Sequence, residues 1–112
     1  MKIYHNPRCS KSRETLALLR EKGVEPTIVE YLKELPTEDE LKRIVDMLGI
    51  KPFDLVRKGE AVYKNEYKSL QLNDDEWIKV MIANPKLIER PIVVKGNSAA
   101  LGRPPENVLK LV

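Results

Sequence analysis

The sequence has very few of the residues that build disulfides and metal centres. Its 112 residues include one cysteine, Cys9, and one histidine, His5. A single cysteine excludes an internal disulfide and also a cysteine-rich metal site. We therefore expect no bound metal or other cofactor. Both scarce residues lie in one short stretch, residues 5–13, which is the most informative part of the chain.

The sequence also lacks a long apolar run and a strong excess of one charge. No stretch approaches membrane-spanning length, and the first residues lack the basic-then-apolar order of a signal peptide. We expect a cytoplasmic protein, because a lone thiol stays reduced in that compartment. The net charge of +3 is too small to indicate nucleic-acid binding. With no repeat or linker, we expect a single domain over residues 1–112.

The pattern of apolar residues predicts alternating strands and helices. Strands are predicted at residues 1–4, 27–32, 90–94 and 99–101, and helices from Cys9 to Gly23 and at 37–49, 52–56, 73–83 and 105–112. Thr37 with Glu40, and Asn73 with Glu76, have the spacing of helix N-terminal capping pairs. We expect an α/β protein with a four-stranded mixed sheet flanked by helices. A helical insertion at about 37–88 separates the second and third strands, and residues 57–59 within it are expected to form an exposed basic loop.

Cys9 is predicted to lie in a strand-to-helix turn, at the N-terminus of the first helix. Free backbone N–H groups and the helix dipole favour an anion there. Arg8, Lys11 and Arg13 act in the same direction, so we expect a depressed pKa and a nucleophilic thiol. The alternative is that Cys9 is a small buried apolar residue, which the nearby cations disfavour. His5 either ends the strand by bonding to a loop carbonyl or orients and relays protons to the thiol.

Several separated motifs resemble one family. They are His5-Asn6-Pro7-x-Cys9-x-x-Ser12-Arg13, Glu25-Pro26, Leu55-Val56-Arg57-Lys58, Arg90-Pro91-Ile92-Val93-Val94 and Gly102-Arg103-Pro104. Together they cover essentially the whole chain, and they are similar to the glutaredoxin-dependent arsenate reductase family. The form of the first motif is closest to the branch of that family with the signature HNPRCSKSR. This resemblance implies a thioredoxin-like fold with a helical insertion.

The resemblance also implies roles around the thiol. Cys9 matches the catalytic cysteine that attacks arsenate, and His5 and Ser12 match positions that tune the thiolate. Pro91 is a candidate for the cis-proline that faces the reactive cysteine in thioredoxin-like proteins. Its alternative role is the ordinary one of a proline that opens a strand.

The resemblance further implies an oxyanion-binding set of arginines. Arg57, Arg90 and Arg103 match the three arginines that hold the arsenic oxyanion, and Arg13 at the end of the first motif is grouped with them. Arginine suits this task because its planar, permanently charged fork pairs with oxyanions. Each of these arginines taken alone would more often be a solvated surface charge.

The need for external reductants is inferred from Ser12, which occupies the position of the second cysteine in a Cys-x-x-Cys pair. The chain cannot close its own disulfide, so an adduct on Cys9 must be resolved by outside thiols. The resemblance implies glutathione and glutaredoxin as partners and arsenate or a similar oxyanion as substrate.

Two alternatives to this function remain. One is a thiol oxidoreductase acting on another oxyanion or an oxidised thiol. The other is a redox-sensing regulator of the Spx type that binds RNA polymerase, which Ser12 and the three arginines disfavour.

Overall fold

The computed structural model describes all residues, 1–112, and divides into two compact units. The first comprises Met1–Glu34 and Arg90–Val112, and the second comprises Leu35–Glu89. The second unit covers nearly the same residues as the helical insertion predicted at about 37–88. None of the helices combines the length and the apolar character needed to cross a bilayer.

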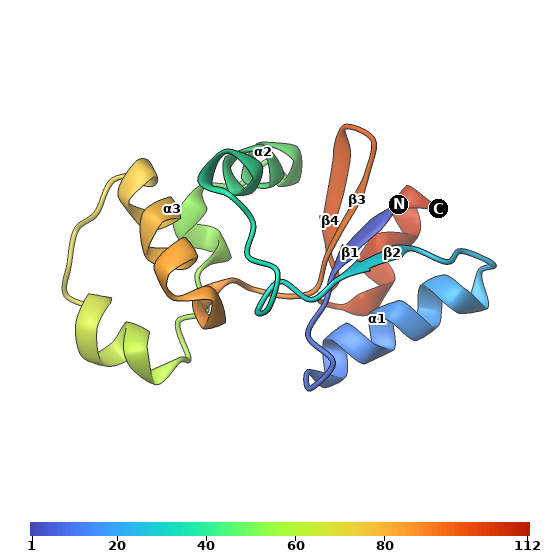
Figure 1. Cartoon of the computed structure of the whole chain (residues 1–112), viewed down its shortest axis with the longest axis horizontal. Helices are drawn as coiled ribbons and strands as arrows, with labels where there is room; N and C mark the ends of the chain where they lie inside the picture. The colour runs from blue at the N-terminus through green and yellow to red at the C-terminus, as the bar shows by residue number, and fades with distance from the viewer. The chain divides into compact units, whose positions relative to one another are not determined.

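The first unit is built on a four-stranded sheet of order β2-β1-β3-β4 (Figure 1). Its strands are β1 (Lys2–Tyr4), β2 (Thr27–Val29), β3 (Ile92–Lys95) and β4 (Ser98–Leu101). β1 pairs in parallel with β2 and antiparallel with β3, and β3 and β4 form a hairpin. The sheet is therefore mixed, and helix α1 (Ser10–Glu21) makes the crossover between its parallel strands. This is the thioredoxin-like arrangement that the sequence motifs predicted.

The core of the first unit lies between the sheet, α1 and the C-terminal 3-10 helix η4 (Pro105–Leu111). Its buried residues are Ile3, Leu16, Leu19, Val93, Ala100, Val108 and Leu111. Leu16 and Leu19 have the helical spacing expected of one buried face. Three elements differ from the predicted ones. β3 begins at Ile92 rather than at residue 90. β2 ends at Val29 rather than at residue 32, because the chain turns at Glu30, and the last helix has 3-10 rather than α geometry.

The second unit consists of helices. α2 (Glu38–Leu48) and α3 (Asp74–Ala83) are its longest. The short helical turns η1 (Pro52–Leu55) and η2 (Tyr63–Tyr67) lie between them, and η3 (Pro85–Leu87) follows α3. The predicted capping pairs are present: Thr37 accepts a hydrogen bond from the Glu40 N–H, and Asn73 and Glu76 cap each other reciprocally. The one-turn π-helix η2 was not predicted, since its sequence has no clear apolar period.

Candidate functional site

Cys9 occupies the loop between β1 and α1 and is the N-cap residue of α1, as its sequence position predicted. The loop is a tight turn in which the Cys9 N–H donates to the Asn6 carbonyl at 3.0 Å. The Asn6 side-chain oxygen accepts the Arg8 N–H at 3.0 Å and so closes the turn a second time. No side chain caps the helix, and no acidic residue stands in its first turn. The N-terminal N–H groups of α1 are thus left to the thiol and to any anion beside it.

Two arginines from the other end of the chain lie at the Cys9 sulfur. Arg103 Nη2 is 3.7 Å from Cys9 Sγ, and Arg103 Nε donates to the Arg90 carbonyl at 2.8 Å. The Arg90 guanidinium also acts on the thiol, whose pKa it lowers. The first unit therefore brings Cys9, Arg90 and Arg103 together, although about ninety residues separate the thiol from Arg103 in the sequence.

These groups change the acidity of the thiol. Burial raises the pKa of Cys9, but the Ser12 backbone N–H, the Arg90 guanidinium and the Lys11 backbone N–H outweigh it, so that the pKa lies below its ordinary value. Cys9 is partly exposed and free. An accessible thiol with a lowered pKa, beside two guanidinium groups, is able to attack an electron-poor centre that carries negatively charged oxygens.

His5 and Ser12 form a buried polar pair beneath the loop. His5 Nδ1 lies 2.6 Å from Ser12 Oγ, and the same hydroxyl accepts the Asn6 N–H at 3.0 Å. Chiefly through burial, the pKa of His5 is lowered, and the nearby positive charges of Arg20 and Arg13 act in the same direction against Glu30. A neutral imidazole thus ties the end of β1 to the first turn of α1. The pair fixes the backbone of Ser12, whose N–H stabilises the thiolate.

The other two candidates of the first unit lie around this loop. Arg13 is exposed, and its Nη1 donates to the Pro7 carbonyl at 3.0 Å, so that in this structure it braces the loop. The Arg90–Pro91 peptide bond, which directly precedes β3, is cis. The Arg103–Pro104 bond is also cis, which no feature of the sequence had indicated.

Arg57 belongs to the second unit, where carboxylates surround it. Its Nη1 lies 2.6 Å from Glu89 Oε1, and its Nε lies 3.4 Å from Glu60 Oε1. The prediction of an exposed basic loop is wrong for Arg57, because its side chain is only 23% exposed. The spacing of Arg57 and Glu60 could have indicated one pair, but Glu89 is too far along the sequence to be foreseen. Participation of Arg57 in oxyanion binding at Cys9 stays a prediction.

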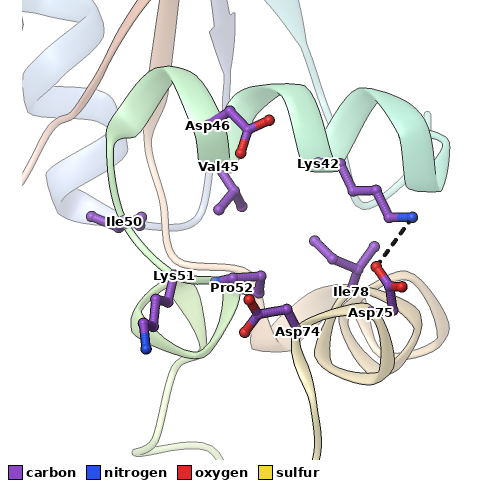
Figure 2. Close-up of a pocket in the computed structure, with 9 residues that line it drawn as sticks. All are labelled: Lys42, Val45, Asp46, Ile50, Lys51, Pro52, Asp74, Asp75 and Ile78. Carbon is purple, nitrogen blue, oxygen red and sulfur yellow. Dashed lines mark ion pairs between the residues drawn. The ribbon is translucent and has the colours of Figure 1, made fainter.

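A hollow of about 270 Å³ lies in the second unit, beside α2, α3 and η1 (Figure 2). It is lined by Lys42, Val45, Asp46, Ile50, Lys51, Pro52, Asp74, Asp75 and Ile78. Lys42 Nζ and Asp75 Oδ1 are 3.3 Å apart across its edge, as the dashed line in Figure 2 marks. With two lysines and three aspartates the lining is net negative, and it contains no thiol or imidazole. Oxyanion chemistry is therefore expected at Cys9 and not at this hollow.

Comparison with known proteins agrees with the motifs. The ArsC family model matches residues 4–111. Among curated proteins, "Uncharacterized protein YfgD" of Escherichia coli is 48% identical over 100% of this chain and 96% of its own length. An "Arsenate reductase" of Haemophilus influenzae is 46% identical over 98% of this chain and 97% of its own. The solved structure "Arsenate reductase from Vibrio cholerae" is 47% identical and superposes with a TM-score of 0.94, covering 100% of this chain and 98% of that one. The chain belongs to the ArsC family, as its separated motifs predicted.

Proposed function

We propose that this chain is a glutathione- and glutaredoxin-dependent arsenate reductase in which Cys9 is the nucleophile. The observation that carries the proposal is the contact between the Cys9 thiol and the guanidinium groups of Arg90 and Arg103 at the uncapped start of α1. The names of the similar proteins from Haemophilus influenzae and Vibrio cholerae support arsenate as the substrate.

The first step forms a bond between the Cys9 sulfur and arsenic. The thiolate supplies the electron pair, and one arsenate oxygen leaves as water after it is protonated. Arsenate and thiolate are both anions, so their approach requires positive charge that is already in place. Arg90 and Arg103 supply that charge, and the Ser12 and Lys11 N–H groups hold the sulfur. Arg57 is proposed as the third oxyanion-binding arginine and Arg13 as a more distant one.

The later steps use external thiols, because the chain has no second cysteine. Glutathione attacks arsenic in the Cys9 adduct and displaces another oxygen as water. A glutaredoxin thiol then attacks the glutathione sulfur, the sulfur–arsenic bond breaks, and its electron pair stays on arsenic. Arsenic(V) thereby becomes arsenic(III), and the electrons come from the two thiols that form the mixed disulfide. Water releases arsenite and restores the Cys9 thiol. A reduced glutathione pool is a cytoplasmic condition, so the proposal includes that location.

The proposal is tested by a coupled assay of the purified chain with arsenate, glutathione, glutaredoxin, glutathione reductase and NADPH. We expect arsenate-dependent NADPH consumption that disappears in Cys9→Ser. If the wild type shows no turnover while Cys9 still reacts with iodoacetamide, arsenate is not the substrate.

A second candidate function would use the same site on a different substrate, by reducing another oxyanion or an oxidised thiol partner. The similarity to the Escherichia coli protein YfgD, whose name assigns no activity, is as high as the similarity to the named reductases. In the assay above, this alternative predicts no response to arsenate and a Cys9-dependent response to a glutathionylated peptide.

A further inference from the structure

Gly102 lies at a close approach between three segments of the first unit. A Cβ atom at this position would be 2.6 Å from Thr15 Oγ1 and 2.7 Å from Pro91 Cγ, distances that real side chains do not reach. The φ angle of Gly102 is outside the left-handed region, so a positive φ is not the reason for glycine here. Glycine is needed here for space.

Hydrogen bonds join the same three segments at this point. The Gly102 N–H donates to the Pro91 carbonyl at 2.9 Å. The buried Thr15 hydroxyl donates to the Lys11 carbonyl at 2.8 Å and lies 3.5 Å from the Gly102 carbonyl. Gly102 thus meets the segment before β3 on one side and the second turn of α1 on the other.

Each of these segments contains groups that contact or stabilise the Cys9 thiolate. Arg90 directly precedes Pro91, and Arg103 directly follows Gly102. The Lys11 and Ser12 N–H groups lie in the turn of α1 that precedes Thr15. The neighbours of Gly102 are therefore attached, within a few bonds, to the groups that surround the sulfur.

We propose that Gly102 is a positioning residue of the thiol site: its missing side chain lets the segments of Arg90, Arg103 and α1 close together around Cys9. A methyl group at this position would push Thr15 and Pro91 apart, because neither is the free end of a flexible side chain. The arginines and the helix N-terminus would then separate from the sulfur. The inference rests on the proposed function only in treating the Cys9 thiolate as the reactive group.

The test is the pH dependence of Cys9 alkylation by iodoacetamide in the full chain, compared between wild type and Gly102→Ala. We expect the midpoint of the rate profile to rise by about one pH unit, which slows alkylation about tenfold at pH values well below the wild-type midpoint. Gly59→Ala is the matched control, since Gly59 has open space around it and a φ outside the left-handed region. Its profile should coincide with that of the wild type.

A rescue separates positioning from general loss of structure. Thr15→Ala removes two of the close contacts, those of Oγ1 and Cγ2, while the Pro91 contact stays. The double variant Gly102→Ala, Thr15→Ala should therefore have a midpoint between those of the wild type and Gly102→Ala. Circular dichroism and a thermal melt establish that each variant is folded.

Two results would overturn the proposal. One is a folded Gly102→Ala with the wild-type midpoint, and the other is a double variant whose midpoint is no lower than that of Gly102→Ala. If Gly102→Ala does not fold, the double variant is compared with Thr15→Ala alone: a higher midpoint supports the proposal, and an equal one rejects it. Alkylation needs neither arsenate nor a reductant, so failure of the arsenate assay would leave this measurement intact.

Discussion

The helix N-termini of the two units differ in what neutralises their free backbone N–H groups. In the second unit, α2 and α3 are capped by Thr37 and Asn73, and each has three acidic residues in its first turn. In the first unit, α1 has Cys9 as its N-cap, with no side-chain cap and no acidic residue in its first turn. Caps and carboxylates stabilise a helix by using up its positive end. The start of α1 lacks that stabilisation, and its positive end lies beside the Cys9 thiol.

The arginines of the two units differ in the same way. Arg90 and Arg103 contact the thiol, whereas Arg57 contacts the carboxylates of Glu60 and Glu89. The first pair of positive charges faces a nucleophile, while the charge of Arg57 is already offset. Arginines that the sequence motifs assign to one oxyanion site thus differ in whether a carboxylate already neutralises their charge. Four experiments test the differences between the two units.

The largest effect is expected from Arg103→Ala in the arsenate assay. Loss of one fixed donor at a developing oxyanion lowers kcat by about a hundredfold to a thousandfold. Arg57→Ala should lower kcat less, because the carboxylates of Glu60 and Glu89 already neutralise its charge. The exposed Arg43 on α2 provides the control, and Arg43→Ala should retain wild-type turnover. A larger loss in Arg57→Ala than in Arg103→Ala would contradict the distinction between the two units.

Cys9→Asp converts the start of α1 into a capped N-terminus like those of α2 and α3. The carboxylate can accept first-turn N–H groups and faces Arg90 and Arg103, so we expect the free energy of unfolding to rise by about 1 kcal/mol while arsenate reduction is lost. Urea denaturation measures the change. Thr37→Ala, which removes the cap of α2, should lower the free energy of unfolding by about 1 kcal/mol. If the free energy of unfolding of Cys9→Asp is no higher than that of the wild type, a side-chain cap at this position does not stabilise α1.

Glu89→Gln removes one of the charges that offset Arg57. If arsenate competes with Glu89 for this guanidinium, KM for arsenate should fall, by about fivefold at most for a partly exposed ion pair. Steady-state kinetics give the value, and Glu25→Gln is the control, because Glu25 pairs with Arg20 on an exposed surface. An unchanged KM in Glu89→Gln, together with a raised KM in Arg57→Ala, would mean that Arg57 binds the oxyanion without such competition.

The smallest effect is expected from Lys11→Glu, which gives α1 an acidic first turn. The lowered pKa of Cys9 means that its alkylation rate rises with pH and reaches its plateau below the pH at which an ordinary thiol does. A carboxylate in this turn disfavours the thiolate and should raise the midpoint by about half a pH unit, so that alkylation below the midpoint slows about threefold. Lys22→Glu at the other end of α1 should change nothing, because the effect of the helix dipole is confined to the terminal turn. Equal shifts in both variants would indicate a general effect of net charge.

The features that short stretches determine were predictable. Cys9 at the start of α1 follows from a strand, a turn and a helix period that are adjacent in the sequence. The caps Thr37 and Asn73 follow from three-residue spacings. Features that depend on distant partners were not predictable: the exposed state expected for Arg57 was wrong because Glu89, at the end of the second unit, pairs with it. β2 was predicted too long because its apolar residues continue past the point where the chain turns.

Local patterns and separately recognisable motifs were enough to predict the family, the order of strands and helices, and the place of Cys9 at a helix N-terminus. The charges that reach the thiol, and the position where no side chain fits, depend instead on how distant segments fold together. Arg103 meets Cys9, and Gly102 meets Thr15, across most of the length of the chain. Contacts of that kind are set by how the sheet and α1 pack together, and no local pattern encodes them.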